Sequence, residues 1–174
     1  MRDWWLRTLL VLVAPRPVFV ALRDESEESI SDRTEPVLAI VLLAGFALAL
    51  ASQAARHYGG LDLLVWTFVA GAITGGVAYW FFGAVLYWAT RALGSLGSYR
   101  RARHVLAFAG VPLAVSLLVT PIGLHRFSYA FLVFVLWSAA LLVVGVRAVH
   151  GWAWPRALAA TLAPVVVAAA LVTI

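Results

Sequence analysis

Five long runs of uncharged, mostly apolar residues constrain this chain more than any other feature of its sequence. A helix that crosses the hydrocarbon core of a bilayer, about 30 Å thick, needs about 20 such residues. The runs are continuously apolar rather than alternating, which favours helices over the strands of a barrel. We therefore predict an all-α, polytopic membrane protein, a bundle of five transmembrane helices with spans at about residues 36–55, 62–90, 104–124, 127–147 and 155–174.

The composition excludes the main alternatives to a membrane protein. Hydrophobic residues make up 64% of the 174 residues and charged residues only 12%, against about 25% charged residues in an average soluble domain. A soluble chain of this length could not cover so much apolar surface, so an ordinary cytosolic enzyme and a disordered chain are excluded. The absence of Cys excludes disulfides, thiol catalysis and thiolate metal sites.

Arginine is distributed unevenly over the predicted connections, and this distribution predicts the orientation. All 13 basic residues are Arg, and every one except Arg56 and Arg126 falls on the side of the N-terminus. Basic connections stay in the cytoplasm, whereas carboxylates have little influence on topology. We expect a multi-pass protein of the cytoplasmic (inner) membrane, with the N-terminus in the cytoplasm and the C-terminus outside.

Residues 1–35 are predicted to form a cytoplasmic segment ahead of the spans: an interfacial amphipathic helix, then an acidic linker. Trp4 and Trp5 are adjacent, and two amphipathic indole rings suit the headgroup layer of a membrane. Arg7 shares a helical face with the acidic residue four positions before it and belongs to the same candidate lipid contact. The Pro-Arg-Pro sequence that follows ends this helix. Residues 24–35 then form either a solvated loop or a docking strip for a basic partner.

Small residues and prolines inside the predicted spans indicate how the helices pack. Gly71 and Gly75 are four residues apart, a spacing that lets two helix backbones approach closely. We expect this face to pack within the bundle in preference to forming a seam between two copies. Pro112 and Pro164 each remove a backbone hydrogen bond and are expected to kink the third and fifth spans. Trp137, near the middle of the fourth span, needs a hydroxyl or carbonyl partner for its indole N–H.

The sequence shows no sign of catalytic chemistry. The five uncharged runs contain none of the ionisable residues that mark proton relays and ion paths inside membranes. The four histidines lack the spacing of a metal site, no nucleophile is paired with a base, and no glycine-rich phosphate motif is present. We therefore expect no enzyme, no metal and no cofactor.

The connection between the second and third predicted spans carries a compact basic cluster. Tyr99 is followed by Arg100, Arg101, Arg103 and His104. These side chains are predicted to lie at the level of anionic headgroups, where each positive charge contributes about 1 kcal/mol of attraction to the surface. The cluster therefore predicts either a site for lipids or a partner, or a set of charges that only fixes the topology.

The same connection also carries the motif of a known family. A glycine-rich turn with a Gly-Ser-aromatic sequence is followed by a basic and apolar segment that ends at a proline in the third span. The residues that fit this pattern are Gly94, Gly97, Ser98, Tyr99, Ala107 and Pro112. The stretch resembles the signature of the Yip domain family, the Ypt/Rab-interacting polytopic membrane proteins, and residues 15–19, 35–36 and 137–157 are similar to that family too.

The resemblance implies an all-helical, five-span fold with a cytoplasmic N-terminus. In eukaryotes the family is associated with vesicle trafficking, Rab-type GTPases and membrane shaping. The exclusive use of Arg and the lack of Cys are typical of a prokaryote of high GC content, so the chain resembles a prokaryotic member of the family.

Two functions remain open from the sequence. The first is a non-enzymatic integral membrane scaffold or adaptor whose cytoplasmic face binds anionic lipid headgroups, a membrane-protein partner or a second copy of the chain; nucleic acid is not expected. The second is a transporter, channel or lipid scramblase for a small solute or lipid. It would need a polar path, for which the spans offer Thr67, Thr74, Tyr79, Ser116, Thr120 and Ser138.

Overall fold

The computed structural model describes residues 2–122 and 124–172, side chains included except at residues 2, 121–126, 128 and 168–172. All regular structure in this part of the chain is helical, as the apolar runs predict. The elements in chain order are α1 (Arg2–Leu10), α2 (Pro15–Ala21), α3 (Glu27–Ala51), the 3-10 helix η1 (Ala54–His57), α4 (Gly60–Ala92), α5 (Tyr99–Ala109), α6 (Val111–Val115), the 3-10 helix η2 (Ser116–Ile122), α7 (Leu124–His150) and α8 (Trp154–Val172).

Within the described residues, four helical segments are long and apolar enough to cross a membrane. Three of them are α3, α4 and the part of α7 from Tyr129 to His150, and the fourth is the stretch Tyr99–Thr120, which runs through α5, α6 and into η2. A multi-pass membrane protein is thereby confirmed. The fifth predicted span coincides with α8, whose described apolar part, Trp154–Val167, is shorter than the other four; the count of five spans stays a prediction.

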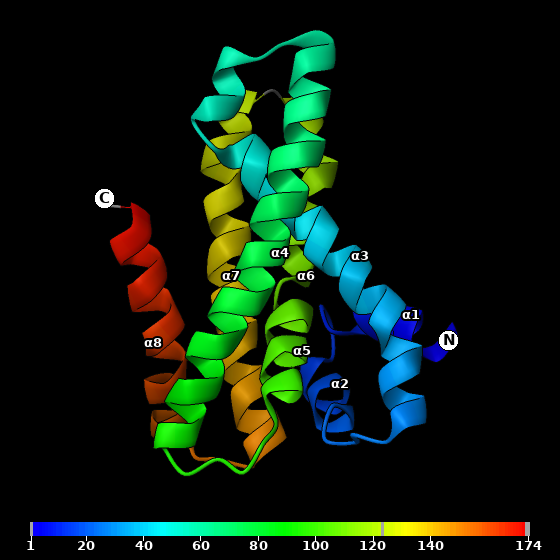
Figure 1. The fold of residues 1–174 in the computed structure, drawn as a ribbon, viewed down its shortest axis with the longest axis vertical. Coiled ribbons are helices and arrows are strands. Elements are labelled where there is room, and N and C mark those ends of the chain that lie inside the picture. The colour runs from blue at the N-terminus through cyan, green and yellow to red at the C-terminus, as the bar shows by residue number, and fades with distance from the viewer. Residues whose placement is uncertain (1, 123, 173–174) are drawn as a thin grey trace.

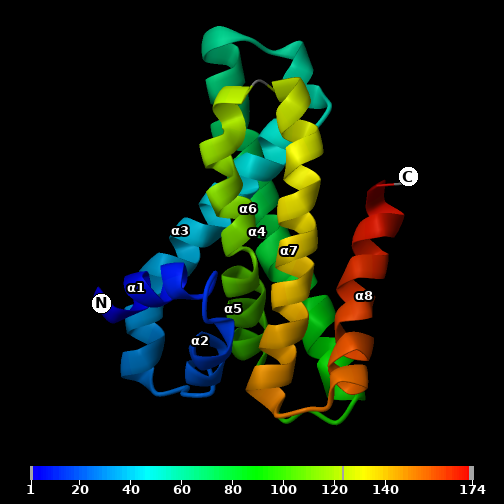
Figure 2. The ribbon, with the colours of Figure 1, turned by 180° about the vertical axis from the view of Figure 1, so that it is seen from behind.

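The helices form an elongated bundle (Figure 1). The helices α4 and α7 run along its long axis, α3 crosses beside α4, and α8 lies along the other side. The view from behind shows α2 beside the end of α7, with α1 lying across the long axis next to α3 (Figure 2). The two N-terminal helices therefore pack against the bundle rather than extending away from it.

The acidic segment before the first span is largely helical. The helix α3 begins at Glu27, because the hydroxyl of Ser26 accepts the backbone N–H of Ser29 and two glutamates occupy the first turn. Both features stabilise a helix N-terminus. The expected linker of residues 24–35 is thus short, and most of it forms the first turns of α3.

Glycines at the crossing of α3 and α4 set how closely these helices pack. Gly71 and Gly75 are buried there, and a Cβ atom added to Gly45 of α3 would lie 2.8 Å from the Cα of Gly75 and closer still to the carbonyl oxygen of Gly71. Each contact is too short for any residue larger than glycine without a shift of one helix. The face that sequence spacing identified on α4 therefore packs within the bundle, and Gly45 is its partner.

The two predicted proline kinks differ. Pro112 lies in the first turn of α6, directly after α5 ends at Ala109, so the third span is divided into two helices as expected. Pro164 is buried within α8, which continues past it.

The indole of Trp137 is 38% exposed on α7, so it faces away from the bundle interior in which a partner was expected.

The main apolar core includes residues of both N-terminal helices. Phe19 of α2 is fully buried against α7, where a Cβ atom added to Gly145 would lie 2.8 Å from its ring. Trp4 of α1 is also buried, 5.6 Å from the ring of Phe108 in α5. The segment before the first span is therefore part of the fold, and its apolar residues complete the core.

Candidate functional site

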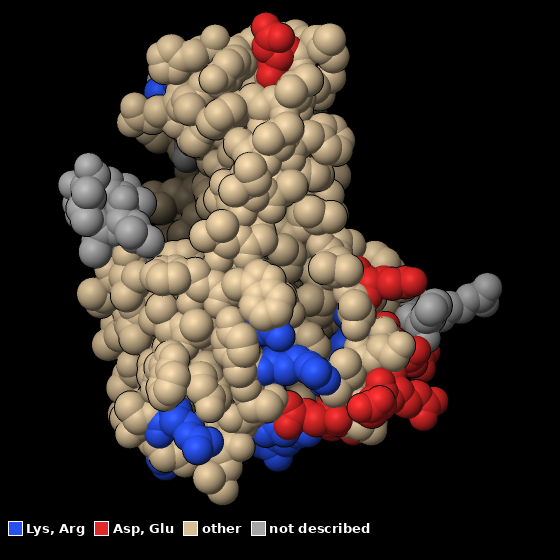
Figure 3. Space-filling view, in the orientation of Figure 1, with Lys and Arg blue, Asp and Glu red and all other residues tan. Residues whose placement is uncertain are grey.

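Charged residues gather at one end of the bundle (Figure 3). The middle of the molecule is uncharged over the face shown, and the opposite end carries few charges, among them Arg56 of η1 and Asp62 of α4. We call the charged end the basic end. It is built by α2, the start of α3, the end of α4, the start of α5, the end of α7 and the start of α8, and it contains Arg16, Arg23, Arg33, Arg91, Arg100, Arg101, Arg103, Arg147 and Arg156.

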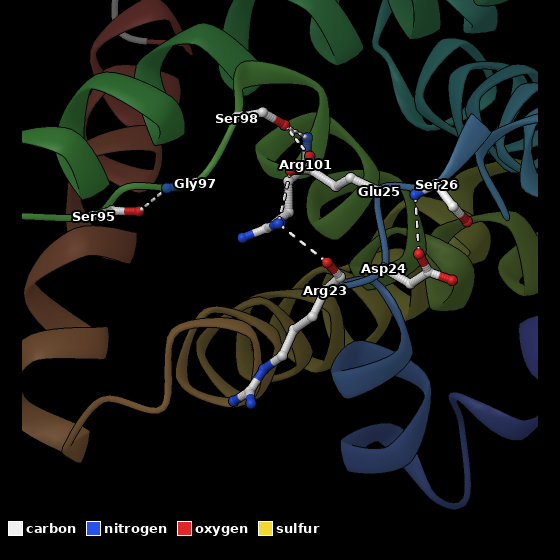
Figure 4. Close-up of polar contacts among 8 residues, drawn as sticks. All are labelled: Arg23, Asp24, Glu25, Ser26, Ser95, Gly97, Ser98 and Arg101. Atoms are coloured by element: carbon white, nitrogen blue, oxygen red, sulfur yellow. Dashed lines mark hydrogen bonds and ion pairs between the residues drawn. The ribbon is translucent and has the colours of Figure 1, made fainter.

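The glycine-rich turn between α4 and α5 has the predicted conformation of a turn. Gly94 has a φ of +83°, in the left-handed region that favours glycine. The hydroxyl of Ser95 accepts the backbone N–H of Gly97 at 2.9 Å (Figure 4). Arg156 of α8 donates to the carbonyl of Leu93, which ties the start of α8 to this turn. The turn fixes where α5 begins and thus where its basic residues lie.

Arg101 connects the start of α5 to the segment between α2 and α3 (Figure 4). Its guanidinium donates to Glu25 at 2.7 Å and to the backbone carbonyl of Arg23 at 3.2 Å. Ser98 caps α5 by accepting the N–H of Arg101 at 3.1 Å, and its hydroxyl donates to the same Glu25. The two carboxylate oxygens are therefore both used, and Arg101 acts as a structural cross-link rather than as a free surface charge.

The neighbouring Asp24 stabilises the same segment. It accepts the backbone N–H of Ser26 at 2.9 Å. This hydrogen bond favours the ionised form and lowers the pKa of the Asp24 carboxyl below its ordinary value. The short connection before α3 is thus held by its own hydrogen bonds as well as by Arg101.

Arg103 lies in an aromatic cage formed by Tyr79 and Trp80 of α4 and by Tyr99 of its own helix, α5. Its guanidinium carbon is 3.7 Å from the ring centre of Trp80, 4.6 Å from that of Tyr99 and 5.1 Å from that of Tyr79. Tyr99 donates its hydroxyl to the backbone carbonyl of Trp80 at 2.8 Å, and the aliphatic part of Arg103 passes over Gly83. Cation–π contacts of this kind hold α5 against α4, so Tyr99 and Arg103 serve packing in this structure.

Two of the predicted headgroup contacts are buried instead. His104 is 5% exposed, because it lies on the face of α5 that carries the core residues Val105 and Phe108. Trp4 is 5% exposed, and Arg7 stacks on its ring at 4.7 Å. Trp5 is 44% exposed and remains available to a membrane surface. Of the predicted basic residues, Arg100 is the exposed one.

Arg33 is a buried cation that the sequence pattern did not single out. Its side chain is fully buried, and none of its three nitrogens has a hydrogen-bond partner within the described structure. The ring of Trp4 lies 5.7 Å away, and Asp24 and Glu25 are among the charges that act on it without contacting it. Because Arg33 falls within the acidic segment 24–35, the sequence suggested that it is solvated. The Ser-Glu-Glu sequence at residues 26–28 is a helix-start signal, and it could have shown that Arg33 belongs to α3.

A polar pocket opens between α2 and the end of α7. It has a volume of about 130 Å³, and its lining includes Arg16, Arg23 and Arg147. Arg147 is more than a hundred residues from Arg16 and Arg23, so no local motif could have brought it to them. The lining of the pocket is therefore cationic.

A second, larger cavity of about 280 Å³ lies within the bundle, between α3, α4, α5, α6, α7 and α8. Its lining is almost entirely apolar; the hydroxyl of Ser138 lies there without a hydrogen-bond partner in the described part of the chain. Of the hydroxyls considered for a polar path, that of Thr67 donates to the carbonyl of Leu63 in its own helix, and that of Ser116, the first residue of η2, donates to the carbonyl of Leu113 in α6. These two hydroxyls are therefore already paired with backbone carbonyls.

Comparison with known families decides the identity of the fold. The family described as the Yip1 domain matches residues 9–174. The chain belongs to the Yip1 domain family. The match covers nearly the whole chain, so the resemblance carried by the glycine-rich turn and Pro112 is confirmed. No curated protein and no solved structure matches this Yip1 domain protein.

The Yip1 domain thus assembles a basic end in which the sequence-predicted residues have distinct surroundings. Arg101 and Arg103 are held by Glu25 and by the aromatic cage, and His104 is buried, while Arg100 stays exposed. Among the described residues no group of three His, Asp or Glu side chains is arranged to hold a metal. Exposed guanidinium groups such as that of Arg100 lie at this end, close to the exposed carboxylates at the start of α3.

Proposed function

We propose that this Yip1 domain protein is a non-enzymatic scaffold or adaptor of the cytoplasmic membrane that engages anionic lipid headgroups through its basic end. The observation that supports it most is the distribution of charge: exposed arginines lie at one end of a membrane-spanning bundle, beside the acidic residues at the start of α3, and the middle of the face shown in Figure 3 is uncharged. Arg91, at the end of α4, and Arg100, near the start of α5, are exposed, and their side chains have no hydrogen bond within the described structure. Such charges attract an anionic surface at about 1 kcal/mol each.

The orientation follows from the same charges. Arginine-rich connections stay in the cytoplasm, so the basic end faces the cytoplasm in this proposal. The helix α8 starts at that end and runs away from it, which supports a C-terminus on the other side in this proposal.

The helix α1 supports contact with the membrane surface on the same side. Trp5, Leu6, Leu9 and Leu10 are exposed on it, while Trp4 anchors it to α5. The helix lies across the long axis of the bundle (Figure 2). An exposed apolar face on a helix in this direction suits the boundary between headgroups and acyl chains. We therefore propose that α1 is the interfacial helix and that it rests on the membrane.

The test neutralises the free arginines and leaves the structural ones unchanged. The double variant Arg91→Gln/Arg100→Gln and the wild type are reconstituted in nanodiscs of mixed phosphatidylcholine and phosphatidylglycerol. We expect the lipids that co-purify with the variant to be less enriched in phosphatidylglycerol, and we expect this loss to be weaker at high salt, which screens exposed charges.

The matched control is Arg56→Gln, which removes a charge from the opposite end of the molecule. Arg56→Gln should leave the phosphatidylglycerol enrichment of the co-purified lipids unchanged. Equal enrichment in the wild type and in Arg91→Gln/Arg100→Gln would contradict the proposed role of the basic end.

A further inference from the structure

The pocket between α2 and α7 is lined by three guanidinium groups from different parts of the fold. Arg16 lies in α2, Arg23 follows that helix, and Arg147 lies in the last turn of α7. The view from behind shows that α2 and this end of α7 are adjacent (Figure 2). The volume of about 130 Å³ far exceeds the ~15 Å³ that admits one water molecule, so a small polyatomic ion has room.

Most of the hydrogen-bond donors around this pocket are unused. A guanidinium carries five N–H donors, and Arg23 donates from Nη2 to the carbonyl of Ala148 at 2.5 Å. Arg147 stacks on Trp154 at 4.3 Å, and its buried Nε has no acceptor in the described part of the chain. Arg16 is exposed and has no hydrogen bond there. More donors therefore surround the pocket than the protein itself satisfies.

The charge around the pocket is not neutralised locally. No Asp or Glu is among the described residues that line it. The acidic residues directly after Arg23 are already occupied, since Asp24 accepts from Ser26 and Glu25 pairs with Arg101. His150, which stacks on the rim residue Trp152 at 4.5 Å, brings no negative charge.

Capping of α7 explains only part of this arrangement. Arginine side chains near a helix C-terminus satisfy its last carbonyls, and Arg23 does so through Ala148. Arg16 makes no such bond within the described structure and still faces the same hollow. Capping of α7 therefore does not explain why three arginine side chains line one pocket.

We propose that this pocket binds a phosphate group, supplied either by the headgroup of an anionic phospholipid or by free phosphate. The planar fork of arginine matches the oxygens of phosphate with paired, charge-assisted hydrogen bonds. The lipid source rests on the proposed function, because it requires the basic end to lie at the headgroup layer; the free-phosphate source does not.

The experiment measures binding to the purified full chain in an uncharged detergent by isothermal titration calorimetry. The probes are inorganic phosphate and dihexanoyl phosphatidylglycerol, titrated at matched ionic strength. The variants are Arg16→Gln, which removes one cation at an exposed position, and Val20→Phe, which fills the pocket without changing its charge. The matched control is Arg56→Gln, which removes one exposed charge at the opposite end of the molecule.

We expect saturable one-to-one binding of at least one probe. Its affinity should fall about tenfold or more in Arg16→Gln, because a charge-assisted hydrogen bond is lost. The affinity should fall by a similar factor in Val20→Phe. The control should bind as the wild type does. Binding of phosphatidylglycerol alone identifies a lipid headgroup, and binding of inorganic phosphate identifies the free ion.

Absence of saturable binding of both probes would overturn the proposal. So would equal affinity in the wild type and both pocket variants, or loss in the control as large as in Arg16→Gln. Because the proposed function is tested with Arg91 and Arg100 and this inference with the pocket residues, the failure of one is separable from the failure of the other.

Discussion

At the scale of single residues, burial rather than charge decides what each arginine does. Arg101 and Arg103 come from one compact sequence cluster, yet one pairs with Glu25 and the other lies among aromatic rings. Arg100, adjacent in sequence, is exposed. A helix turns by about 100° per residue, so consecutive residues of α5 meet α4, the acidic segment and solvent in turn.

Arg33 offers a prediction at this scale. A buried guanidinium without hydrogen-bond acceptors destabilises a fold, and a well-packed apolar residue of similar volume is often neutral or stabilising by about 1–4 kcal/mol. We therefore expect Arg33→Met to raise the midpoint of thermal unfolding in detergent, followed by the fluorescence of the eight tryptophans.

The control for this change is Arg100→Met, at an exposed position of the same end. It should shift stability by no more than about 0.5 kcal/mol in either direction. A lower midpoint in Arg33→Met than in the wild type would show that an acceptor of Arg33 exists and that its charge supports the fold.

At the scale of elements, the crossing of α3 and α4 depends on glycines. Any side chain at Gly75 would meet the backbone of Val41, whereas Gly76, one residue along the same helix, faces open space. We expect Gly75→Ala to destabilise the protein by about 1–3 kcal/mol, the typical cost of overpacking. Thermal unfolding in the same detergent measures the effect.

Gly76→Ala is the matched control, with the same chemical change on the same helix. It should be neutral or stabilising, by up to about 1 kcal/mol, because alanine restricts the unfolded chain and favours a helix. Equal destabilisation by both changes would mean that backbone flexibility, and not the approach of α3, explains the need for glycine at position 75.

The sequence predicts the features that nearby residues determine, and it does not predict contacts between helices that are distant in the chain. The helices, the turn at Gly94 and the break at Pro112 follow from run length and from residues that act on their own backbone. The pairing of Arg101 with Glu25 and the meeting of Arg16 with Arg147 could not be predicted, because they depend on how distant helices pack. His104 and Trp4 were assigned to the surface by residue type, whereas the orientation of their helices buries them.

At the scale of the whole molecule, the bundle has two chemically different ends, and its orientation can be measured directly. The chain contains no Cys, so a single introduced thiol reports on one position. Glu28 at the basic end and Leu61 at the opposite end are both exposed. With a membrane-impermeant maleimide added to intact cells, we expect Leu61→Cys to be labelled and Glu28→Cys to be protected until the membrane is opened.

The reverse labelling pattern would contradict the proposed orientation. Labelling of both positions in intact cells would indicate a mixed topology. The Cys-free wild type supplies the background for both measurements.

The burial of Phe19 against Gly145 also has a consequence for the order in which the molecule is completed during synthesis. The surface that receives α2 lies on α7, more than a hundred residues further along the chain. At about 5–20 residues per second, the ribosome needs roughly 6–25 s to make it. Throughout that interval the apolar side chains of α2 must rest on the membrane or on a chaperone. The helix α2 therefore reaches its final position only after the much later α7 has been made.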